Sequence, residues 1–115
     1  AGVQFEQIIS IFLENAYKYT NKGEIIVNVK INDNSMKCSV TDTGIGISNR
    51  HKNKIFDRFT RSKKNKKSGL GIGLYIAKEL TIKLNGNIKV KDNPKQKGSV
   101  FIIELPVYKK IPKSI

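Results

Sequence analysis

Two glycine-rich runs and a polar segment before them carry the residues of this chain that could do chemistry. The runs are DTGIGI at residues 42–47 and GLGIGL at residues 69–74. Glycines this close together let backbone amides approach an anion without obstruction from side chains. Upstream, Asn15 offers a metal ligand and Lys18 a cation, while Asp42 is a directional hydrogen-bond acceptor. Together the three segments predict a nucleotide site.

The elements that must position these segments follow from the periodicity of the sequence. Apolar spacing and stop signals predict three helices, from about 3 to 20, from about 53 to 59 and from about 70 to 84. β-rich runs bounded by turn residues predict strands at 24–31, 36–41, 88–91 and 99–105. Pairs of antiparallel strands separated by long helices are typical of an α+β, two-layer sandwich.

Length and composition limit the class of protein. A chain of 115 residues is expected to be one domain, residues 1–115, with one core and one site. No apolar run approaches the roughly 18 residues needed to cross a bilayer, and no signal-peptide pattern is present. The one cysteine, Cys38, lies in an alternating apolar stretch, so we expect it to be buried. A disulfide framework is excluded, and a cytoplasmic domain is expected.

Positive charge is concentrated in one part of the chain. The net charge is +13, and nine of the 22 Lys and Arg residues lie in the range 50–67. Residues 62–68 contain no apolar side chain, which indicates a solvated loop. This loop is either a plain surface loop or a cover for a polyphosphate bound at the following glycines. No aromatic residue is interleaved with its lysines, so nucleic-acid binding is not expected.

The two best-known glycine motifs do not fit. A dinucleotide-binding fold places its glycines directly after a strand, whereas Gly69 follows the lysine-rich loop. A phosphate-binding P-loop needs Lys and then Ser or Thr after its last glycine, but Leu74 follows Gly73. The nucleotide site must therefore be of another kind.

Five sequence boxes in a fixed order resemble one family. They read NAYKYT, DTGIGI, IFDRF, GLGIGL and GSVF, at residues 15–20, 42–47, 55–59, 69–74 and 98–101. In this order they resemble the catalytic ATP-binding domain of bacterial sensor histidine kinases, a group related to gyrase B, Hsp90 and MutL. The resemblance implies the Bergerat (GHKL) fold. In that fold a mixed, mostly antiparallel sheet packs against helices, and a mobile lid, here about 48–72, covers the ATP.

The resemblance also implies ATP and Mg²⁺ as cofactors, with one role for each box. Asn15 would be the Mg²⁺ ligand, and Lys18 would reach a phosphate. Asp42 would accept a hydrogen bond from the exocyclic amine of adenine, with Ser99 assisting where Thr is more usual. The residues expected to bind ATP are Asn15, Lys18, Tyr19, Asp42, Gly44, Gly46, Ile47, Gly69, Leu70, Gly71, Gly73, Leu74 and Ser99.

Catalytic roles are expected for Asn15, Lys18 and one of two arginines. Arg58 and Arg61 lie in or beside the IFDRF box, and either could reach the γ-phosphate or a partner domain. The phenylalanines of this box could dock on that partner or pack under the lid. Other interpretations remain: Asp42 could cap a turn, Asn15 could be an exposed helix residue, and the second glycine run could be a hinge.

Ile11 departs from the family pattern, and His51 does not have the sequence context of a phosphoacceptor histidine. Ile11 stands where the family carries a second Asn and where hydrolysing relatives carry a catalytic glutamate, so water activation is not expected. His51 precedes Lys52 and lacks the acidic neighbour of a phosphoacceptor histidine. The resemblance therefore implies an acceptor histidine on a separate dimerisation domain, a response regulator as the next partner, and a membrane-anchored parent.

Three functions remain open from the sequence. The first is a histidine kinase catalytic domain that donates the γ-phosphoryl group of ATP to a histidine. The second is an anti-sigma serine kinase of the same fold, against which the IFDRF box argues. The third is a degenerate, non-catalytic binding module, which salt-sensitive nucleic-acid binding without Mg-ATP binding would favour.

Overall fold

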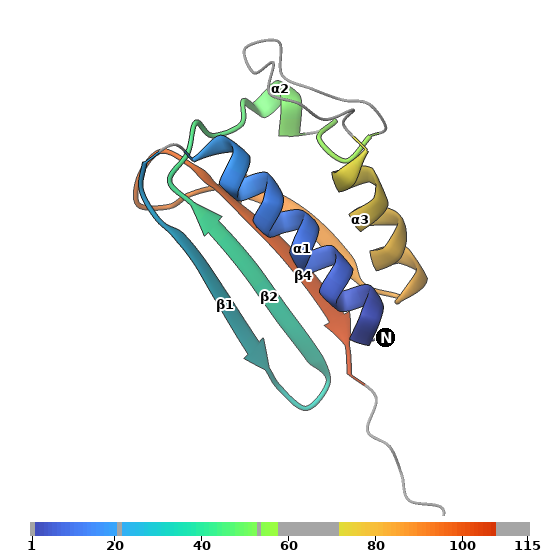
Figure 1. Ribbon diagram of the computed structural model, residues 1–115. Coiled ribbons are helices and arrows are strands. Elements are labelled where there is room, and N and C mark those ends of the chain that lie inside the picture. Colours follow the sequence, from blue (N-terminus) through green and yellow to red (C-terminus); the bar gives the residue numbers. More distant parts are fainter. Residues whose placement is uncertain (1, 21, 53, 58–71, 108–115) are drawn as a thin grey trace, which may run out of the picture.

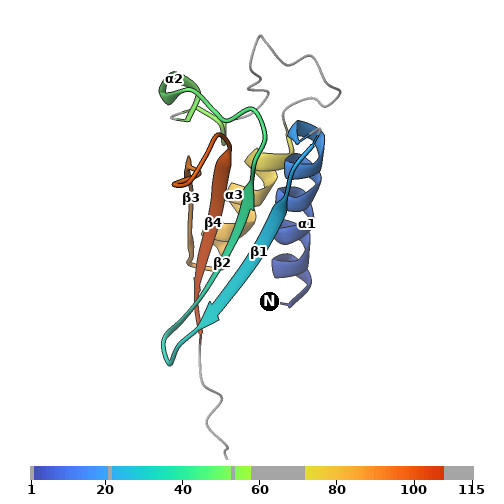
Figure 2. The ribbon, with the colours of Figure 1, turned by 90° about the vertical axis from the view of Figure 1, so that its left-hand side faces the viewer.

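Figure 1 shows the computed structural model, which describes residues 2–20, 22–52, 54–57 and 72–107. Its elements run in the order α1 (Gly2–Tyr19), β1 (Ile25–Ile31), β2 (Ser35–Asp42), α2 (Asn49–Lys52), α3 (Gly73–Lys83), β3 (Asn87–Asp92) and β4 (Ser99–Pro106). The strands form a sheet in the order β1-β2-β4-β3, and all three pairings are antiparallel. Helices α1 and α3 cover one face of this sheet (Figures 1 and 2). The expected α+β, two-layer fold is confirmed.

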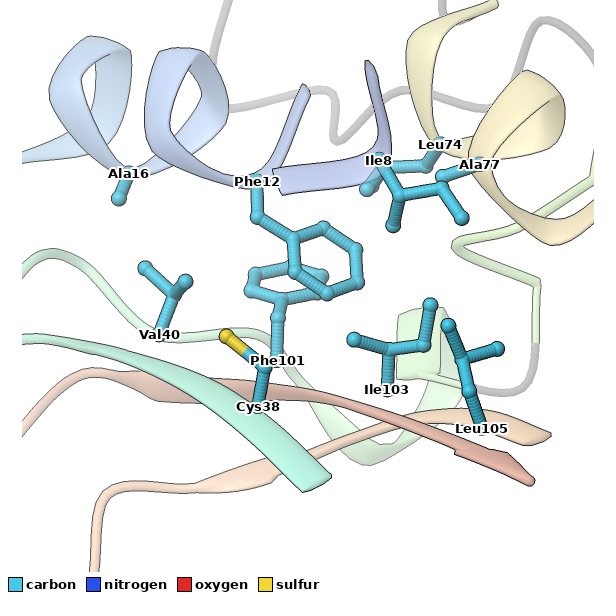
Figure 3. Close-up of a cluster of buried hydrophobic side chains, with 10 residues drawn as sticks. All are labelled: Ile8, Phe12, Ala16, Cys38, Val40, Leu74, Ala77, Phe101, Ile103 and Leu105. Atoms are coloured by element: carbon cyan, nitrogen blue, oxygen red, sulfur yellow. The ribbon is translucent and has the colours of Figure 1, made fainter. Parts of the chain in front are cut away.

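The core lies between α1, α3 and the two central strands (Figure 3). Strand alternation points Cys38 and Val40 of β2 to the same face as Phe101 of β4, where α1 supplies Phe12. The rings of Phe12 and Phe101 lie 5.5 Å apart between centroids and are tilted by 38°. Cys38 is buried, as its alternating neighbourhood predicted, and burial raises the pKa of its thiol.

The four strands and the two long helices form where the periodicity predicted them, whereas the prediction for the short helix was wrong. The short helix α2 precedes the expected range, and residues 54–57 form turns. Ser48 explains the earlier start, because its side-chain oxygen accepts a hydrogen bond from His51 N at 3.3 Å. Residues 53, 58 and 59 of the expected helix lie outside the described residues. Helix α3 begins at Gly73, after Ile72 as its N-cap residue.

One end of the molecule collects the segments that carry the candidate chemistry. The C-terminal ends of α1 and β2, the start of β4, helix α2 and the N-terminus of α3 all lie at the upper end of Figure 1. The β1–β2 turn and the α3–β3 turn lie at the opposite end. No helix among the described residues is long and apolar enough to span a membrane.

Candidate functional site

Asp42, the last residue of β2, is a carboxylate held almost out of solvent. The residue as a whole is only 4% exposed to solvent. Oδ1 accepts two backbone hydrogen bonds, from Gly44 N at 2.9 Å and from Ser99 N at 3.2 Å. Both of these bonds end on Oδ1, and no hydrogen bond to Oδ2 is seen among the described residues, so the lone pairs of Oδ2 are candidate acceptor sites for another donor. The bond to Gly44 also shows that the turn-capping interpretation and the binding interpretation are compatible.

The pKa of Asp42 reflects two opposing effects. Burial, the larger one, raises the pKa above its ordinary value because it disfavours the charged form. The two backbone N–H groups lower it, because they stabilise the negative charge. The net direction is upward, and perturbed carboxylate pKa values are more frequent at functional sites than elsewhere.

The turn between β3 and β4 supports Asp42 from the other side. Asn93 Nδ2 donates a hydrogen bond to the main-chain oxygen of Asp42 at 2.9 Å. Gly98 has φ +139°, and a Cβ at this position would overlap the same main-chain oxygen. From the sequence, Asn93 was only one of the turn residues between the strands predicted at 88–91 and 99–105, so its role was missed. Its partner is 51 positions away in the chain, and no local pattern signals such a contact.

The end of α1 packs directly against the first glycine run. A Cβ on Gly44 would overlap the main-chain oxygen of Tyr19 and would lie 3.0 Å from Thr20 Oγ1, so only glycine fits there. The hydroxyl of Thr20 is buried and has no hydrogen-bond partner among the described residues. Thr43 lies directly before Gly44, and its Oγ1 accepts a hydrogen bond from Glu24 N at 3.0 Å. These contacts fix the turn that carries Asp42 against the α1–β1 connection.

Asn15 and Lys18 lie on the same helical stripe of α1 as Ile11. Both residues are half-buried. They follow Ile11 at spacings of four and seven residues, which places all three on one helical stripe. A Cβ on Gly73 would lie 3.5 Å from Ile11 Cγ2, so this stripe borders the beginning of α3. Asn15 and Lys18, for which the sequence predicts a metal ligand and a cation, therefore share a helical stripe with a residue that borders Gly73.

The N-terminus of α3 completes the described part of the site. The first amides of a helix lack intrahelical partners and carry the positive end of the helix dipole. At Ile72 no side chain caps these amides, and Gly73 is exposed. Leu74 is buried in the core, where it anchors the first turn of the helix. An anionic ligand could therefore approach the exposed backbone here.

The remaining predicted site residues divide into two groups. Gly46 has φ +78° and lies near the backbone of Gly98, and Ile47 packs partly buried against the core. Phe56 of the IFDRF box packs edge-on to Phe101, with ring centroids 6.3 Å apart. The predicted residues that lie outside the described part of the chain are Arg58, Arg61, Gly69, Leu70 and Gly71.

The oxygen donors of the described residues fit a magnesium ion that takes most of its ligands from water and phosphates. No group of three or more His, Cys, Asp or Glu side chains that could hold a metal occurs among the described residues. Asn15 supplies a hard, neutral oxygen at the expected position. Mg²⁺ keeps several waters and commonly takes its other ligands from phosphates, so one protein oxygen suits an ion that arrives with a nucleotide.

Comparisons with known proteins agree with this geometry. Residues 2–109 match the family model described as histidine kinase-, DNA gyrase B-, and HSP90-like ATPase. Sensor protein CiaH of Streptococcus pneumoniae (strain TIGR4) is 42% identical over 106 residues, which cover 89% of this chain and 24% of CiaH. The chain thus spans about a quarter of the length of that relative.

Solved structures give the same result. The mycobacterial sensor histidine kinase MprB has a TM-score of 0.85 and is 28% identical, over 92% of this chain and 74% of the MprB chain. Full-length ShkA, solved in complex with AMPPNP, has a TM-score of 0.79 and is 29% identical, over 90% of this chain and 21% of the ShkA chain.

Proposed function

The chain belongs to the histidine kinase-, DNA gyrase B- and HSP90-like ATPase family, and from this premise we propose that it is the Mg-ATP-binding catalytic domain of a two-component sensor histidine kinase. It would donate the γ-phosphoryl group of ATP to a histidine on a separate dimerisation domain. The observation that carries the proposal is the buried carboxylate of Asp42, which two backbone amides and the Asn93 side chain hold in place. Such a fixed acceptor suits recognition of a base through its amino group.

The adenine end of the proposed site is built around Asp42. An ionised carboxylate can only accept hydrogen bonds, so Oδ2 would pair with the exocyclic amine of adenine and would repel the O6 carbonyl of guanine. Tyr19 would lie beside the base, at the point where α1 meets Gly44. Ser99 touches Asp42 through its backbone amide, so its hydroxyl remains a candidate for a water-mediated contact with the base.

The phosphate end would use α1 and the start of α3. Asn15 would hold the Mg²⁺, which neutralises charge on the phosphates when bound. Lys18 would contribute a positive charge near a phosphate, and the amides around Gly73 would donate hydrogen bonds. Gly69, Gly71 and either Arg58 or Arg61 would act from the lid, as the family resemblance implies.

The transfer step needs little chemistry from these residues. A ring nitrogen of the acceptor histidine attacks the γ-phosphorus, and the bond from that phosphorus to the β–γ bridging oxygen breaks to leave ADP. Positioning and neutralisation of charge are the contributions of the catalytic domain to such a step. Ile11 stands at the position where hydrolysing relatives carry a catalytic glutamate, and its apolar side chain lies beside Gly73. This supports transfer to histidine rather than hydrolysis by a gyrase-like route.

The partners follow from the same proposal. The relatives that match this chain include sensor proteins several times longer than it, so the acceptor histidine would lie elsewhere in a parent protein. We expect the phosphohistidine to pass its phosphoryl group to a response regulator. The parent would be membrane-anchored, with this domain on the cytoplasmic side.

Calorimetry and a transfer assay together test the proposal. The chain should bind a non-hydrolysable ATP analogue in the presence of Mg²⁺ and should bind the GTP analogue much more weakly. When a separate dimerisation domain from the parent protein is added with ATP, its histidine should acquire an acid-labile phosphoryl group. A dimerisation domain with that histidine replaced by Gln is the control. Equal affinity for the two analogues, or labelling of the Gln control, would contradict the proposal.

A further inference from the structure

Asn93 uses both ends of its side chain, and the two ends serve different parts of the molecule. Its Oδ1 accepts a hydrogen bond from Lys95 N at 2.9 Å, which shapes the β3–β4 turn. Its backbone N donates to Gly98 O at 3.0 Å, which closes the same turn. Its Nδ2 leaves the turn and donates to Asp42 O at 2.9 Å. One side chain therefore ties the turn to the carboxylate-bearing end of β2.

The bond to Asp42 replaces a missing sheet bond. The register between β2 and β4 ends with Thr41 opposite Val100, one residue before Asp42. A main-chain carbonyl in a buried residue needs a donor, because leaving it unpaired is destabilising. Gly98 lies so close to this carbonyl that any side chain there would overlap it. The Asn93 amide thus supplies the donor at a place where the β2–β4 ladder has already ended, although β1 still pairs with β2 there.

The same small region then fixes the carboxylate itself. Ser99 N, which follows the β3–β4 turn directly, donates to Asp42 Oδ1 at 3.2 Å. Gly44 N donates to the same oxygen at 2.9 Å. The main chain of Asp42 is held by Asn93, and its side chain is held by Ser99 and Gly44. The direction in which Oδ2 points depends on all three.

We propose that Asn93 is a positioning residue for base recognition: its hydrogen bond to the Asp42 carbonyl sets the direction in which Oδ2 meets the 6-amino group of adenine. The inference rests on the proposed function, because it takes the adenine of ATP as the ligand of Asp42. Asn93 does not touch the base. Its effect is therefore limited to nucleotides that carry a 6-amino group, since hydrogen bonds weaken steeply with poor alignment.

The β1–β2 turn offers a matched control. Asn32 Oδ1 accepts hydrogen bonds from Asn34 N at 2.9 Å and from Ser35 N at 2.7 Å. This is the same turn-shaping use of an Asn oxygen as in Asn93, but it lies at the opposite end of the sheet (Figure 1). Replacement by Asp keeps the acceptor oxygen in both turns. Only Asn93→Asp also removes an N–H donor from Asp42.

The experiment compares two nucleotides that differ only at the position Asp42 would read. Calorimetry with Mg²⁺ measures the affinities of a non-hydrolysable ATP analogue and of the same analogue with hydrogen in place of the 6-amino group. Asn93→Asp should lower the affinity for the ATP analogue about 10-fold, as expected for one misaligned hydrogen bond to a charged group. The affinity for the 6-hydrogen analogue should stay unchanged. Asn93→Ala, which adds no charge, should act in the same direction. Asn32→Asp and Asn32→Ala should match wild type with both nucleotides.

The outcomes separate this inference from the proposed function. If wild type prefers the ATP analogue and the Asn93 variants keep that preference undiminished, Asn93 has only a structural role and the inference is overturned. The same holds if both affinities fall equally, or if only the melting temperature changes. If wild type binds the two analogues equally, the adenine assignment of Asp42 fails, and the inference fails with it. A preference that collapses in both Asn93 variants and in neither Asn32 variant supports the inference.

Discussion

The two hairpin turns of the sheet use the same residue type for the same local purpose and differ in what else they hold. In the β1–β2 turn the oxygen of Asn32 accepts bonds only from its neighbours Asn34 and Ser35, and all three residues are exposed or half-buried. In the β3–β4 turn the oxygen of Asn93 does the same for Lys95. The Asn93 amide, however, continues to a buried carbonyl of another strand.

The difference between the two turns extends to the ends of the sheet that they close. At the β3–β4 end, two backbone amides bind the Asp42 carboxylate, and the Asn93 side-chain amide binds the main-chain oxygen of the same residue. Gly98, against that oxygen, and Gly44, against the main-chain oxygen of Tyr19, leave no room for a Cβ. At the β1–β2 end no carboxylate is buried among the described residues. A turn that only reverses the chain needs local bonds, whereas a turn that belongs to a site also needs bonds between elements.

The largest effect is expected from Asp42→Asn. The Asn oxygen would still face the amides of Gly44 and Ser99, but its NH₂ group would then oppose the amino group of adenine, so two donors would meet. We expect the affinity for a Mg-ATP analogue to fall by at least about 100-fold, because a site built to accept a hydrogen bond loses its partner. Calorimetry measures this fall, and undiminished binding would contradict the adenine assignment.

A smaller effect is expected from Asn15→Ala, and only with magnesium present. Loss of the one protein oxygen proposed for Mg²⁺ should lower the affinity for the ATP analogue about 10-fold when Mg²⁺ is present. With EDTA in place of Mg²⁺ the affinity should hardly change. Asn28→Ala, at an exposed position of β1, is the control. The measurement is the ratio of the two dissociation constants for each variant. If Asn15→Ala weakened binding equally with and without the metal, Asn15 would not be the ligand.

Substitutions at two glycines, Gly98 and Gly86, allow a direct comparison of the two ends of the sheet. A Cβ on Gly98 would overlap Asp42 O, and a Cβ on Gly86 would overlap Leu105 Cδ2. Each Gly→Ala change should therefore destabilise the fold, by about 1–3 kcal/mol. Only Gly98→Ala should also weaken nucleotide binding, because Gly86 belongs to the α3–β3 turn, which lies at the opposite end of the molecule (Figure 1).

Thermal denaturation and calorimetry measure the two effects of these glycine changes separately. Gly2→Ala, where an added Cβ meets no atom within 4 Å, serves as the neutral reference. Equal loss of binding in Gly98→Ala and Gly86→Ala, after correction for the folded fraction, would show that the two ends do not differ in function.

The smallest effect concerns stability against pH. Since burial raises the folded-state pKa of Asp42 above its unfolded value, folding favours the neutral form. The contribution of Asp42 to stability is therefore present at low pH and is lost as pH rises through the raised pKa. Asn is uncharged throughout, so the advantage of Asp42→Asn over wild type in unfolding free energy should grow with pH. Urea denaturation from about pH 3 to 7 measures this difference, and a constant difference would contradict the direction of the shift.

Much of the fold could be predicted from the sequence because it depends on local patterns. The helical spacing of apolar residues predicts one buried face of α1, made by Phe5, Ile8, Ile9, Phe12, Leu13 and Ala16. Ile8, Phe12 and Ala16 are fully buried, whereas Leu13 is 37% exposed. Alternation along β2 likewise predicts the burial of Cys38 and Val40. Helix α2 was misplaced, because its start depends on the capping residue Ser48 rather than on apolar spacing.

The site could be predicted only in part. Asp42 was identified because its glycine-rich surroundings and the order of the five boxes form a sequence pattern. The cap of Asp42 on the Gly44 amide was anticipated, and Ser99 was expected beside Asp42. The hydrogen bonds from the Asn93 side chain and from Ser99 N were not, since they span 51 and 57 positions of the chain. Contacts of this kind arise from strand order, which no short motif encodes. The same is true of the close approach of Gly44 to Tyr19.

Amide chemical shifts recorded during a titration with a Mg-ATP analogue test the central claim most directly. The account predicts that the amides of Gly44, Ser99, Asn15 and Gly73 shift as the nucleotide saturates the chain. The amides of the β1–β2 turn, residues 32–35, should stay unchanged in the same spectra. Shifts at that turn with none at Gly44 and Ser99, or no shifts at all, would contradict the claim that this end of the sheet binds ATP.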